Sequence, residues 1–595
     1  MDATPQPLPD AGEIAKTYAE VAQRASKLLT EHIQRQAREG LAAPVDELGI
    51  AQAFMDMMAK MLANPYRLAQ AQMSLAWDYF ALWQQSTLRL MGMNAAPVAQ
   101  PAKDDKRFKD EQWQENFLFD FIKQSYLITA RHIHDSVNGV EGLDERSQQK
   151  VNFYTRQFVD ALSPSNFALT NPEVVRETLK SQGQNLLKGF NNLLRDIEEG
   201  NGQLRIKMTD ASAFELGKNV AATPGKVIFQ NDLFQLLQFE PATQEVYKRP
   251  LLIFPPWINK YYILDLREKN SFIKWAVDQG HTVFVMSWVN PDAQLAEKTY
   301  EDYLTEAALV AVDKVCEQTG EQTMNAVGYC LGGTLLGTAL AYMAVKKDKR
   351  IASATFFTTM LDFSIPGELG VFIDEQQVAG LEKKMTERGY LEGSEMAGTF
   401  NILRANDLIW SFVVNNYLMG KDPFPFDLLF WNSDSTRMPC MMHSFYLRNM
   451  YMKNLLKEPD GLTLGGVPID LGKIKTPSYF ISTIDDHIAP WQSTYLGAQR
   501  FTGPVRFVLG GSGHIAGIIN PPAANKYGYW LNGKLTEPAE QWLEYAQQHT
   551  GSWWTDWQQW ISQLDNAKVP ARNPSQGKLK PIEDAPGAYV KLRLA

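Results

Sequence analysis

The chain has 595 residues, of which 45% are hydrophobic and 21% are charged. This length predicts two domains, or one large domain with an extension, and the composition excludes a disordered, collagen-like or disulfide-stapled chain. Acidic residues outnumber basic residues by 67 to 58, which gives a net charge of −9. Because a protein that binds nucleic acid through general charge is basic, we expect no nucleic-acid partner.

Cysteine usage and the absence of long apolar runs indicate a cytoplasmic protein. Cys316, Cys330 and Cys440 are odd in number and fit neither a disulfide framework nor a Cys-x-x-Cys metal pair. With no cluster of Cys and His at ligand spacing, we expect no metal. The first residues lack the basic and apolar segments of a signal peptide, so we expect no export. No apolar run reaches the ~18 to 20 residues that cross a bilayer, so contact with a lipid-like surface would be peripheral.

The first part of the chain, residues 1–205, is predicted to be a helical domain, because its apolar residues recur at intervals of three and four. One such stripe is unusually rich in aromatic residues and methionine. It consists of Met73, Trp77, Phe80, Trp83 and Met91. The stripe either packs on neighbouring helices or forms an adaptable face that binds a partner or a surface. The sequence leaves both interpretations open.

Three signals divide this helical region. Residues 95–107 have the Ala-, Pro- and charge-rich composition of a linker, and the aromatic residues after Phe117 predict a further amphipathic helix. Asn171, Pro172 and an acidic residue in the first turn predict a helix that runs to about Glu199. The Gly-Asn-Gly sequence at 200–202 ends it, and we expect the domain boundary just after this point.

The second part, residues 206–595, alternates short β-rich runs with helical stretches. The runs lie at 250–254, 281–288, 324–328, 351–358, 479–483 and 505–509. This pattern predicts an α/β domain with a mostly parallel sheet covered on both faces. The alternation stops between residues 362 and about 472, where Gly, Pro and aromatic residues are frequent. We interpret that segment as a cap inserted over the edge of the sheet.

The strongest chemical motif is Gly-Tyr-Cys-Leu-Gly-Gly at residues 328–333, between an apolar run and a helical stretch. Strand, tight turn and helix with a nucleophile at the apex is the pattern of the G-x-S-x-G nucleophile elbow, with sulfur in place of oxygen. The alternative is a buried structural cysteine in a Gly-rich helix start. Cys316 and Cys440 lack such a turn, and we assign them structural roles.

A thiol needs a histidine base and a carboxylate that orients the base. Asp486 follows the run at 479–483 and His514 follows the run at 505–509. Nucleophile, acid and histidine therefore occur in the order of an α/β-hydrolase fold. Asp485 and His487 compete for these roles, but His487 directly adjoins the acid, and we assign it a supporting role in the loop.

An oxyanion hole requires one backbone N–H from the residue after the nucleophile, here Leu331, and a second from a loop after an early strand. Pro-Pro-Trp-Ile-Asn-Lys at residues 255–260 follows such a strand. We expect the second donor near Trp257 and Ile258, and we assign the N–H of Ile258 as donor and Trp257 as a supporting residue.

Several long motifs closely resemble class I polyhydroxyalkanoate synthases, the family of poly-3-hydroxybutyrate synthases. The matching segments are 255–262, 328–333, 426–434, 485–491, 513–523 and 586–591. The resemblance covers most of residues 110–595. It implies an α/β-hydrolase-like fold, with Cys330 as nucleophile, Asp486 as acid and His514 as general base.

The resemblance also implies an acyltransferase without a cofactor, which polymerises (R)-3-hydroxyacyl-CoA thioesters and releases CoA. It implies a homodimer at the surface of polyester granules in the cytoplasm, with the growing polyester and granule-associated proteins as partners. Two alternatives remain open. One is a cysteine-type esterase or depolymerase that uses water as acceptor, and the other is a non-catalytic granule-coating protein.

Overall fold

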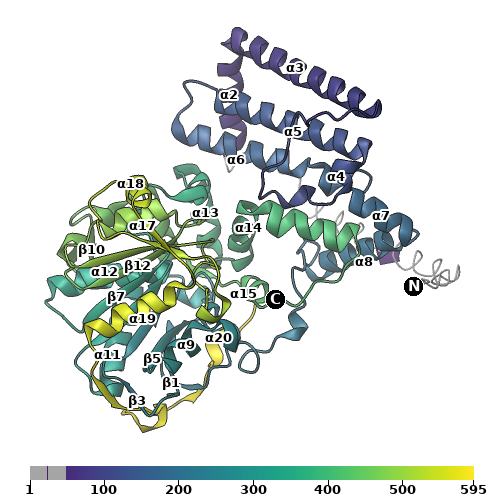
Figure 1. Cartoon of the computed structure of the whole chain (residues 1–595). Helices are drawn as coiled ribbons and strands as arrows, with labels where there is room; N and C mark the ends of the chain where they lie inside the picture. Colours follow the sequence, from purple (N-terminus) through teal and green to yellow (C-terminus); the bar gives the residue numbers. More distant parts are fainter. Residues whose placement is uncertain (1–22, 25–48, 595) are drawn as a thin grey trace. The chain divides into compact units, whose positions relative to one another are not determined.

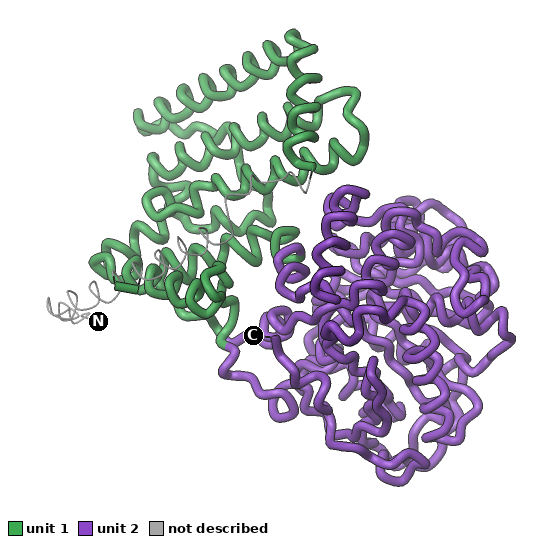
Figure 2. The backbone as a smooth tube through the Cα atoms, turned by 180° about the vertical axis from the view of Figure 1, so that it is seen from behind, with its two compact units in different colours: residues 1–210, 400–424 green, residues 211–399, 425–595 purple. Residues whose placement is uncertain are grey.

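The structure is a computed structural model that describes residues 23–24 and 49–594. The chain divides into two compact units, residues 1–210 with 400–424 and residues 211–399 with 425–595 (Figure 2). The segment 362–472, which we predicted to be one insertion, is divided between the units, because 400–424 belongs to unit 1. Our predictions for residues 1–22 and 25–48, the start of the chain included, lie outside the described residues.

Unit 1 is helical where it is described, as the apolar spacing predicts. Its helices are α2 (Ile50–Leu62), α3 (Pro65–Leu90), α4 (Gln112–Glu115), α5 (Phe117–Asn138), α6 (Glu145–Ala161), α7 (Pro172–Lys180) and α8 (Gln184–Glu199). The N-cap prediction is confirmed, since Asn171 accepts a hydrogen bond from the Glu173 N–H at 3.0 Å. The prediction of a single helix from Pro172 to Glu199 was wrong. Gln182 and Gly183 adopt positive φ angles of 52° and 85°, and this left-handed pair ends α7 before α8 begins.

The aromatic stripe of α3 lies on an exposed face. Its five members, Met73, Trp77, Phe80, Trp83 and Met91, are between 47% and 69% exposed. The buried residues of α3 are Leu82, Gln85 and Ser86, which lie on a different face of the helix. The interpretation that the stripe packs on neighbouring helices was therefore wrong for the part of the chain that the structure describes.

Unit 2 contains, within the described residues, an 11-stranded sheet with the order β15-β14-β13-β12-β7-β6-β4-β5-β2-β1-β17. Its strands are β1 (Gly225–Gln230), β2 (Phe234–Phe239), β4 (Leu251–Phe254), β5 (Val283–Trp288), β6 (Met324–Tyr329), β7 (Ile351–Phe357), β12 (Ser478–Thr483), β13 (Val505–Gly510), β14 (Tyr529–Leu531), β15 (Gln547–His549) and β17 (Glu583–Asp584). Neighbours from β5 to β13 pair in parallel, and the outer strands pair antiparallel. The prediction of a mostly parallel sheet is confirmed.

Short two-stranded sheets and helices complete unit 2 (Figure 1). The small sheets pair β3 (Glu245–Tyr247) with β16 (Lys568–Pro570) and β8 (Tyr390–Leu391) with β9 (Met438–Pro439), and β10 (Leu462–Leu464) forms a hairpin with β11 (Val467–Ile469). The helices are α9 (Phe272–Asp278), α10 (Tyr300–Asp302), α11 (Leu309–Thr319), α12 (Leu331–Val345), α13 (Glu375–Arg388), α15 (Asp427–Asn432), α16 (Cys440–Tyr446), α17 (Trp491–Ala498), α18 (Ala539–Glu544), α19 (Trp553–Leu564) and α20 (Ala588–Lys591). Helix α14 (Gly393–Leu403) contains the boundary between the units.

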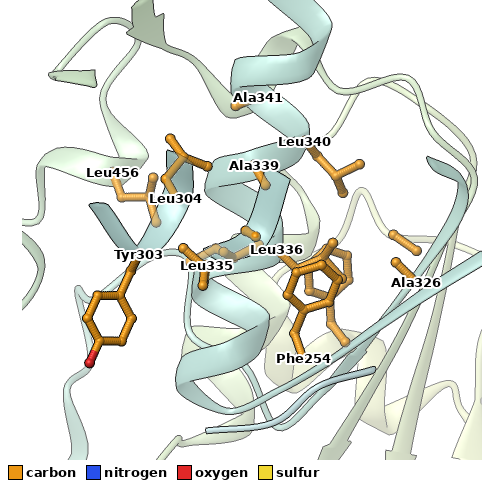
Figure 3. Close-up of a cluster of buried hydrophobic side chains, with 14 of the residues drawn as sticks. Phe254, Tyr303, Leu304, Ala326, Leu335, Leu336, Ala339, Leu340, Ala341 and Leu456 are labelled. Atoms are coloured by element: carbon orange, nitrogen blue, oxygen red, sulfur yellow. The ribbon is translucent and has the colours of Figure 1, made fainter. Parts of the chain in front are cut away.

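The two faces of the sheet carry separate apolar cores. On one face, α12 packs Leu335, Leu336 and Leu340 against Phe254 of β4 and Ala326 of β6 (Figure 3). On the other face, the tryptophans of α19 pack among residues of α9 and of the central strands. Full burial of one such side chain contributes roughly 1.5 to 3 kcal/mol, so these layers hold the central strands and their carboxyl-end loops in place.

The structure also bears on membrane contact. Among residues 23–24 and 49–594, no helix has both the length and the apolar character needed to span a membrane.

Candidate active site

Cys330 occupies a sharp turn between β6 and α12. Its backbone has φ 52° and ψ −118°, a region that costs a residue other than glycine about 1 to 3 kcal/mol. The turn is held on both sides, because the Cys330 N–H donates to the Phe357 carbonyl at 2.9 Å and the Cys330 carbonyl accepts from the Gly333 N–H at 2.9 Å. The thiol is half-buried. The sequence pattern of strand, turn and helix is therefore observed at this cysteine.

The glycines of the motif permit close backbone contacts that a side chain would block. A Cβ at Gly328 would lie 2.4 Å from the Cα of Gly333. A Cβ at Gly332 would lie 2.0 Å from the carbonyl oxygen of Phe254 and 2.6 Å from that of Pro255. Distances below about 3 Å are not sterically possible, so this packing requires glycine. The start of α12 consequently lies directly against the beginning of the loop 255–260.

His514 and Asp486 form a buried hydrogen-bonded pair. The loop after β13 carries His514, and the loop after β12 carries Asp486. The Nδ1 of His514 lies 2.7 Å from Oδ2 of Asp486. The other carboxylate oxygen, Oδ1, accepts the N–H groups of Ile488 and Ala489, each at 2.9 Å. These contacts fix the carboxylate, and the carboxylate in turn orients the imidazole.

Cys330 lies close enough to this pair for its charge to act on the His514 imidazole. Burial alone lowers the pKa of His514. The negative charges of Asp486 and Cys330 and the hydrogen bond to Asp486 outweigh that effect, and they raise the pKa of His514 well above its ordinary value. These two neighbours therefore favour the protonated form of the imidazole. Such an arrangement can stabilise a thiolate or return a proton to a leaving group.

The structure distinguishes Asp486 and His514 from their neighbours in sequence. Asp485 is exposed, and its N–H donates to the Ser512 carbonyl at 3.0 Å. His487 is half-buried, and its carbonyl oxygen would lie 2.8 Å from a Cβ at Gly367. Hence His487 packs against the start of the cap, and its supporting role remains a prediction.

The two expected oxyanion donors lie on the segments that meet at Gly332. Leu331 is the first residue of α12, and Ile258 lies in the half-buried part of the loop 255–260. Among the described residues, neither backbone N–H donates a hydrogen bond within the chain. The ring of Trp257 is buried, and it packs edge-on against Tyr303 and Tyr446 with centroid distances of 5.2 and 6.1 Å. The buried ring of Trp257 thereby anchors the loop 255–260.

Sequence reasoning missed two tyrosines of the cap, Tyr446 and Tyr451. Burial is the main cause of their raised pKa values, and the negative charge of Cys330 adds to it for both residues. Tyr446 also donates to Oγ1 of Thr334 at 3.3 Å, which joins the cap to α12. No motif marked these residues, because their position follows from the fold of the cap.

Comparisons with known proteins agree with this fold and motif set. Residues 104–276 match the family "Poly-beta-hydroxybutyrate polymerase (PhaC) N-terminus", and residues 250–521 match the α/β hydrolase fold. The poly(3-hydroxyalkanoate) polymerase subunit PhaC of Rhizobium meliloti (strain 1021) is 48% identical over 98% of this chain and 94% of its own length. The poly(3-hydroxyalkanoate) polymerase of Methylorubrum extorquens is 50% identical over 89% of this chain and 88% of its own length.

Among solved structures, a monoacylglycerol lipase of Paleococcus ferrophilus is similar, at 14% identity and a TM-score of 0.30. It covers 47% of this chain and 90% of its own length.

Proposed function

Because the chain belongs to the poly(3-hydroxyalkanoate) polymerases, which are acyltransferases, we propose that it polymerises (R)-3-hydroxyacyl-CoA thioesters into polyester with release of CoA, through a covalent thioester on Cys330. The hydrogen-bonded pair of His514 and Asp486 beside Cys330, at the carboxyl ends of parallel strands, is the observation that carries this mechanism. The three residues supply a nucleophile, a base and a carboxylate that orients the base.

In the first step, the thiol proton already lies on His514, and the thiolate sulfur of Cys330 attacks the thioester carbonyl. The bond between the carbonyl carbon and the CoA sulfur breaks, and the proton on His514 passes to the departing CoA thiolate. One thioester replaces another, so the step is nearly balanced in free energy. The acyl group on Cys330 remains activated.

In the second step, His514 removes the proton from the 3-hydroxyl group of another hydroxyacyl unit, whose oxygen attacks the acyl group on Cys330. The carbon–sulfur bond breaks, an oxygen ester forms, and the thiolate of Cys330 recovers the proton. Asp486 stabilises the imidazolium during both steps. We propose that the N–H groups of Leu331 and Ile258 stabilise the oxyanion of each tetrahedral intermediate.

Chain growth requires that a hydroxyl group reaches the acyl-enzyme before water does. Tyr446 of the cap is buried, and the buried ring of Trp257 packs on it. Tyr451 packs edge-on against Tyr446 with a centroid distance of 6.0 Å. This aromatic cover supports the proposal that the cap segments of unit 2 limit access of water.

We further propose that the protein works as a homodimer at the surface of cytoplasmic polyester granules and contacts granule-associated proteins there. The exposed stripe of α3 supports the surface location, because Trp77, Phe80 and Trp83 offer a contiguous apolar face to a hydrophobic polymer.

The test supplies (R)-3-hydroxybutyryl-CoA to the purified protein and measures both free CoA and the acyl product. We expect free CoA together with insoluble polyester, and a hydroxyacyl adduct on Cys330 in the intact mass of the protein. Release of CoA with soluble 3-hydroxybutyric acid alone would show an esterase. Turnover without any dependence on Cys330 would refute the covalent mechanism.

A further inference from the structure

A buried lysine lies at the end of the loop that carries Ile258. The side chain of Lys260 is 4% exposed, and its ammonium group can donate three hydrogen bonds. It donates to the carbonyl oxygens of Val590 at 2.8 Å and Leu592 at 2.6 Å, and it lies 2.8 Å from Oδ1 of Asp434. The ammonium thus joins the loop 255–260 to Asp434 by an ion pair and to residues 590–592 by two hydrogen bonds.

Asp434 is equally enclosed, with a side chain that is 1% exposed. Its Oδ2 accepts the hydroxyl of Tyr262 at 2.9 Å, and the guanidinium of Arg593 lies 3.6 Å from Oδ1. Lys260 is the last residue of the loop 255–260, and Tyr262 follows two residues later. The carboxylate therefore binds that part of the loop at two positions.

Side chains also hold the backbone of the loop itself. The Trp288 indole N–H donates to the Pro255 carbonyl at 2.8 Å, and the Thr436 hydroxyl donates to the Trp257 carbonyl at 2.6 Å. The Trp431 indole N–H donates to the Lys260 carbonyl at 2.7 Å. The Trp257 carbonyl and the Ile258 N–H belong to the same peptide plane, so the hydrogen bond from Thr436 restricts the direction of the Ile258 N–H.

An ion pair buried this deeply is a weak source of stability, since removing two charges from water offsets most of their attraction. Apolar residues of similar volume would hold the core at a similar free energy. They would not hold the backbone carbonyl groups of Val590 and Leu592 by directed hydrogen bonds. The Lys260–Asp434 pair therefore needs an explanation in terms of geometry.

We propose that Lys260 and Asp434 are positioning residues, which fix the loop 255–260 so that the Ile258 N–H points at the oxyanion formed at Cys330. This inference rests on the proposed function and deepens it. The pair acts through the backbone and does not touch the substrate. Its contribution is therefore made in the transition state for acylation and not in the binding of the thioester.

The experiment compares Lys260→Met, Asp434→Asn, the double variant and Tyr262→Phe with the wild-type chain. The matched control is Asp556→Asn. Asp556 is also a buried carboxylate that accepts a tyrosine hydroxyl, from Tyr479 at 3.0 Å, and pairs with a basic side chain, Arg506. Arg506 and Tyr479 lie at the amino ends of β13 and β12, whereas the candidate active site lies at the carboxyl ends of the strands.

Two quantities are measured for each variant, the midpoint of thermal unfolding and the single-turnover rate of CoA release as a function of (R)-3-hydroxybutyryl-CoA concentration. Each single substitution of the Lys260–Asp434 pair leaves a buried group without its partner and should lower the midpoint. The double variant should regain most of this loss.

All variants of the pair, the double variant included, should show a maximal rate about 10-fold to 100-fold below wild type. The concentration at half-maximal rate should stay within about twofold, because substrate binding is not affected. Tyr262→Phe removes one hydrogen bond and no charge, so it should fold and show the same change to a smaller extent. Asp556→Asn should lose stability and keep the wild-type rate.

A double variant or Tyr262→Phe with the wild-type maximal rate would refute the positioning role, as would an equal loss of rate in Asp556→Asn. If the wild-type chain and the Asp556→Asn control release no CoA and acquire no acyl adduct, the proposed function itself fails. The two failures are therefore distinguishable.

Discussion

Asp486 binds His514 with one carboxylate oxygen and its own loop with the other. Oδ2 lies 2.7 Å from the imidazole Nδ1, while Oδ1 accepts the N–H groups of Ile488 and Ala489. A single side chain thereby links the orientation of the histidine to the conformation of the loop after β12. The charge of Asp486 therefore acts on the histidine, while the hydrogen bonds that its side chain accepts hold the loop.

Asp486→Asn tests the charge. Asparagine keeps an oxygen that can accept the N–H groups of Ile488 and Ala489, so we expect a folded protein. Polymerisation should fall by about 10³- to 10⁴-fold, because the amide neither stabilises the imidazolium nor fixes the correct tautomer. Steady-state CoA release and thermal unfolding of the same preparation measure the two effects. Wild-type turnover in this variant would remove Asp486 from the mechanism.

The raised pKa of His514 also predicts how stability depends on pH. A folded-state pKa above the unfolded value gives a stabilisation that is complete below about pH 6.5 and is lost as the pH rises through the folded-state pKa. The difference in free energy of unfolding between wild type and Asp486→Asn should therefore be largest near pH 6 and shrink in alkaline solution. Urea unfolding over a series of pH values measures it. A constant difference would mean that Asp486 does not raise the pKa of His514.

The three cysteines differ in their surroundings, and alanine substitutions should distinguish the nucleophile from the other two. Cys330→Ala should abolish polymer formation and the acyl adduct. Cys316→Ala and Cys440→Ala should keep the wild-type rate of CoA release, because neither residue has the left-handed backbone of Cys330 or acts on the charge of His514. Intact-mass spectrometry after a brief exposure to (R)-3-hydroxybutyryl-CoA identifies the modified residue. An adduct that survives in Cys330→Ala contradicts the assignment.

Gly332→Ala tests the contact between α12 and the loop 255–260. The added Cβ would lie 2.0 Å from the Phe254 carbonyl oxygen, so backbone must shift, at a cost of about 1 to 3 kcal/mol and most of the activity. Gly380→Ala is the matched control. Gly380 lies within α13 with no atom within 4 Å of an added Cβ, and alanine there should stabilise the fold by about 0.5 to 1 kcal/mol. Chemical denaturation compares the two. Equal stability of both variants would contradict the close approach.

The exposed face of α3 is tested by replacing Trp77, Phe80 and Trp83 with serine. Turnover of soluble substrate should be unchanged, while binding to preformed polyester particles should weaken at least about 10-fold, since burial of one such ring contributes more than 1.4 kcal/mol. Tyr545→Ser, which removes an exposed aromatic residue of unit 2, is the control. Co-sedimentation with the particles measures the partition, and unchanged sedimentation would show that another surface binds the polymer.

The central strands could be predicted from the sequence, because parallel strands buried on both faces are continuous apolar runs with little polar interruption. The outer strands could not. β2 contains Gln235 and Gln238, which are buried in the sheet and interrupt the apolar pattern. Asp486 and His514 could be located because each follows a predicted strand.

The neighbours that shape the candidate site were harder to find. Tyr446 of the cap bonds Thr334 in the helix after Cys330, about a hundred residues away in the chain, and Lys260 finds its partners at Asp434 and at residues 590–592. Such contacts depend on tertiary folding and leave no local pattern. The exposure of the α3 stripe was undecided for the same reason, since apolar spacing is identical for a buried and an exposed face.

The hydrogen bonds from Lys260 to Val590 and Leu592 have a consequence for the timing of biosynthesis. Translation supplies Lys260 more than three hundred residues before these two carbonyl groups exist. Before residues 590 and 592 are synthesised, the Lys260 ammonium lacks two of its hydrogen-bond acceptors. The loop 255–260 is then held by fewer contacts. The loop 255–260 therefore reaches its final set of contacts only after residues 590–592 have been synthesised.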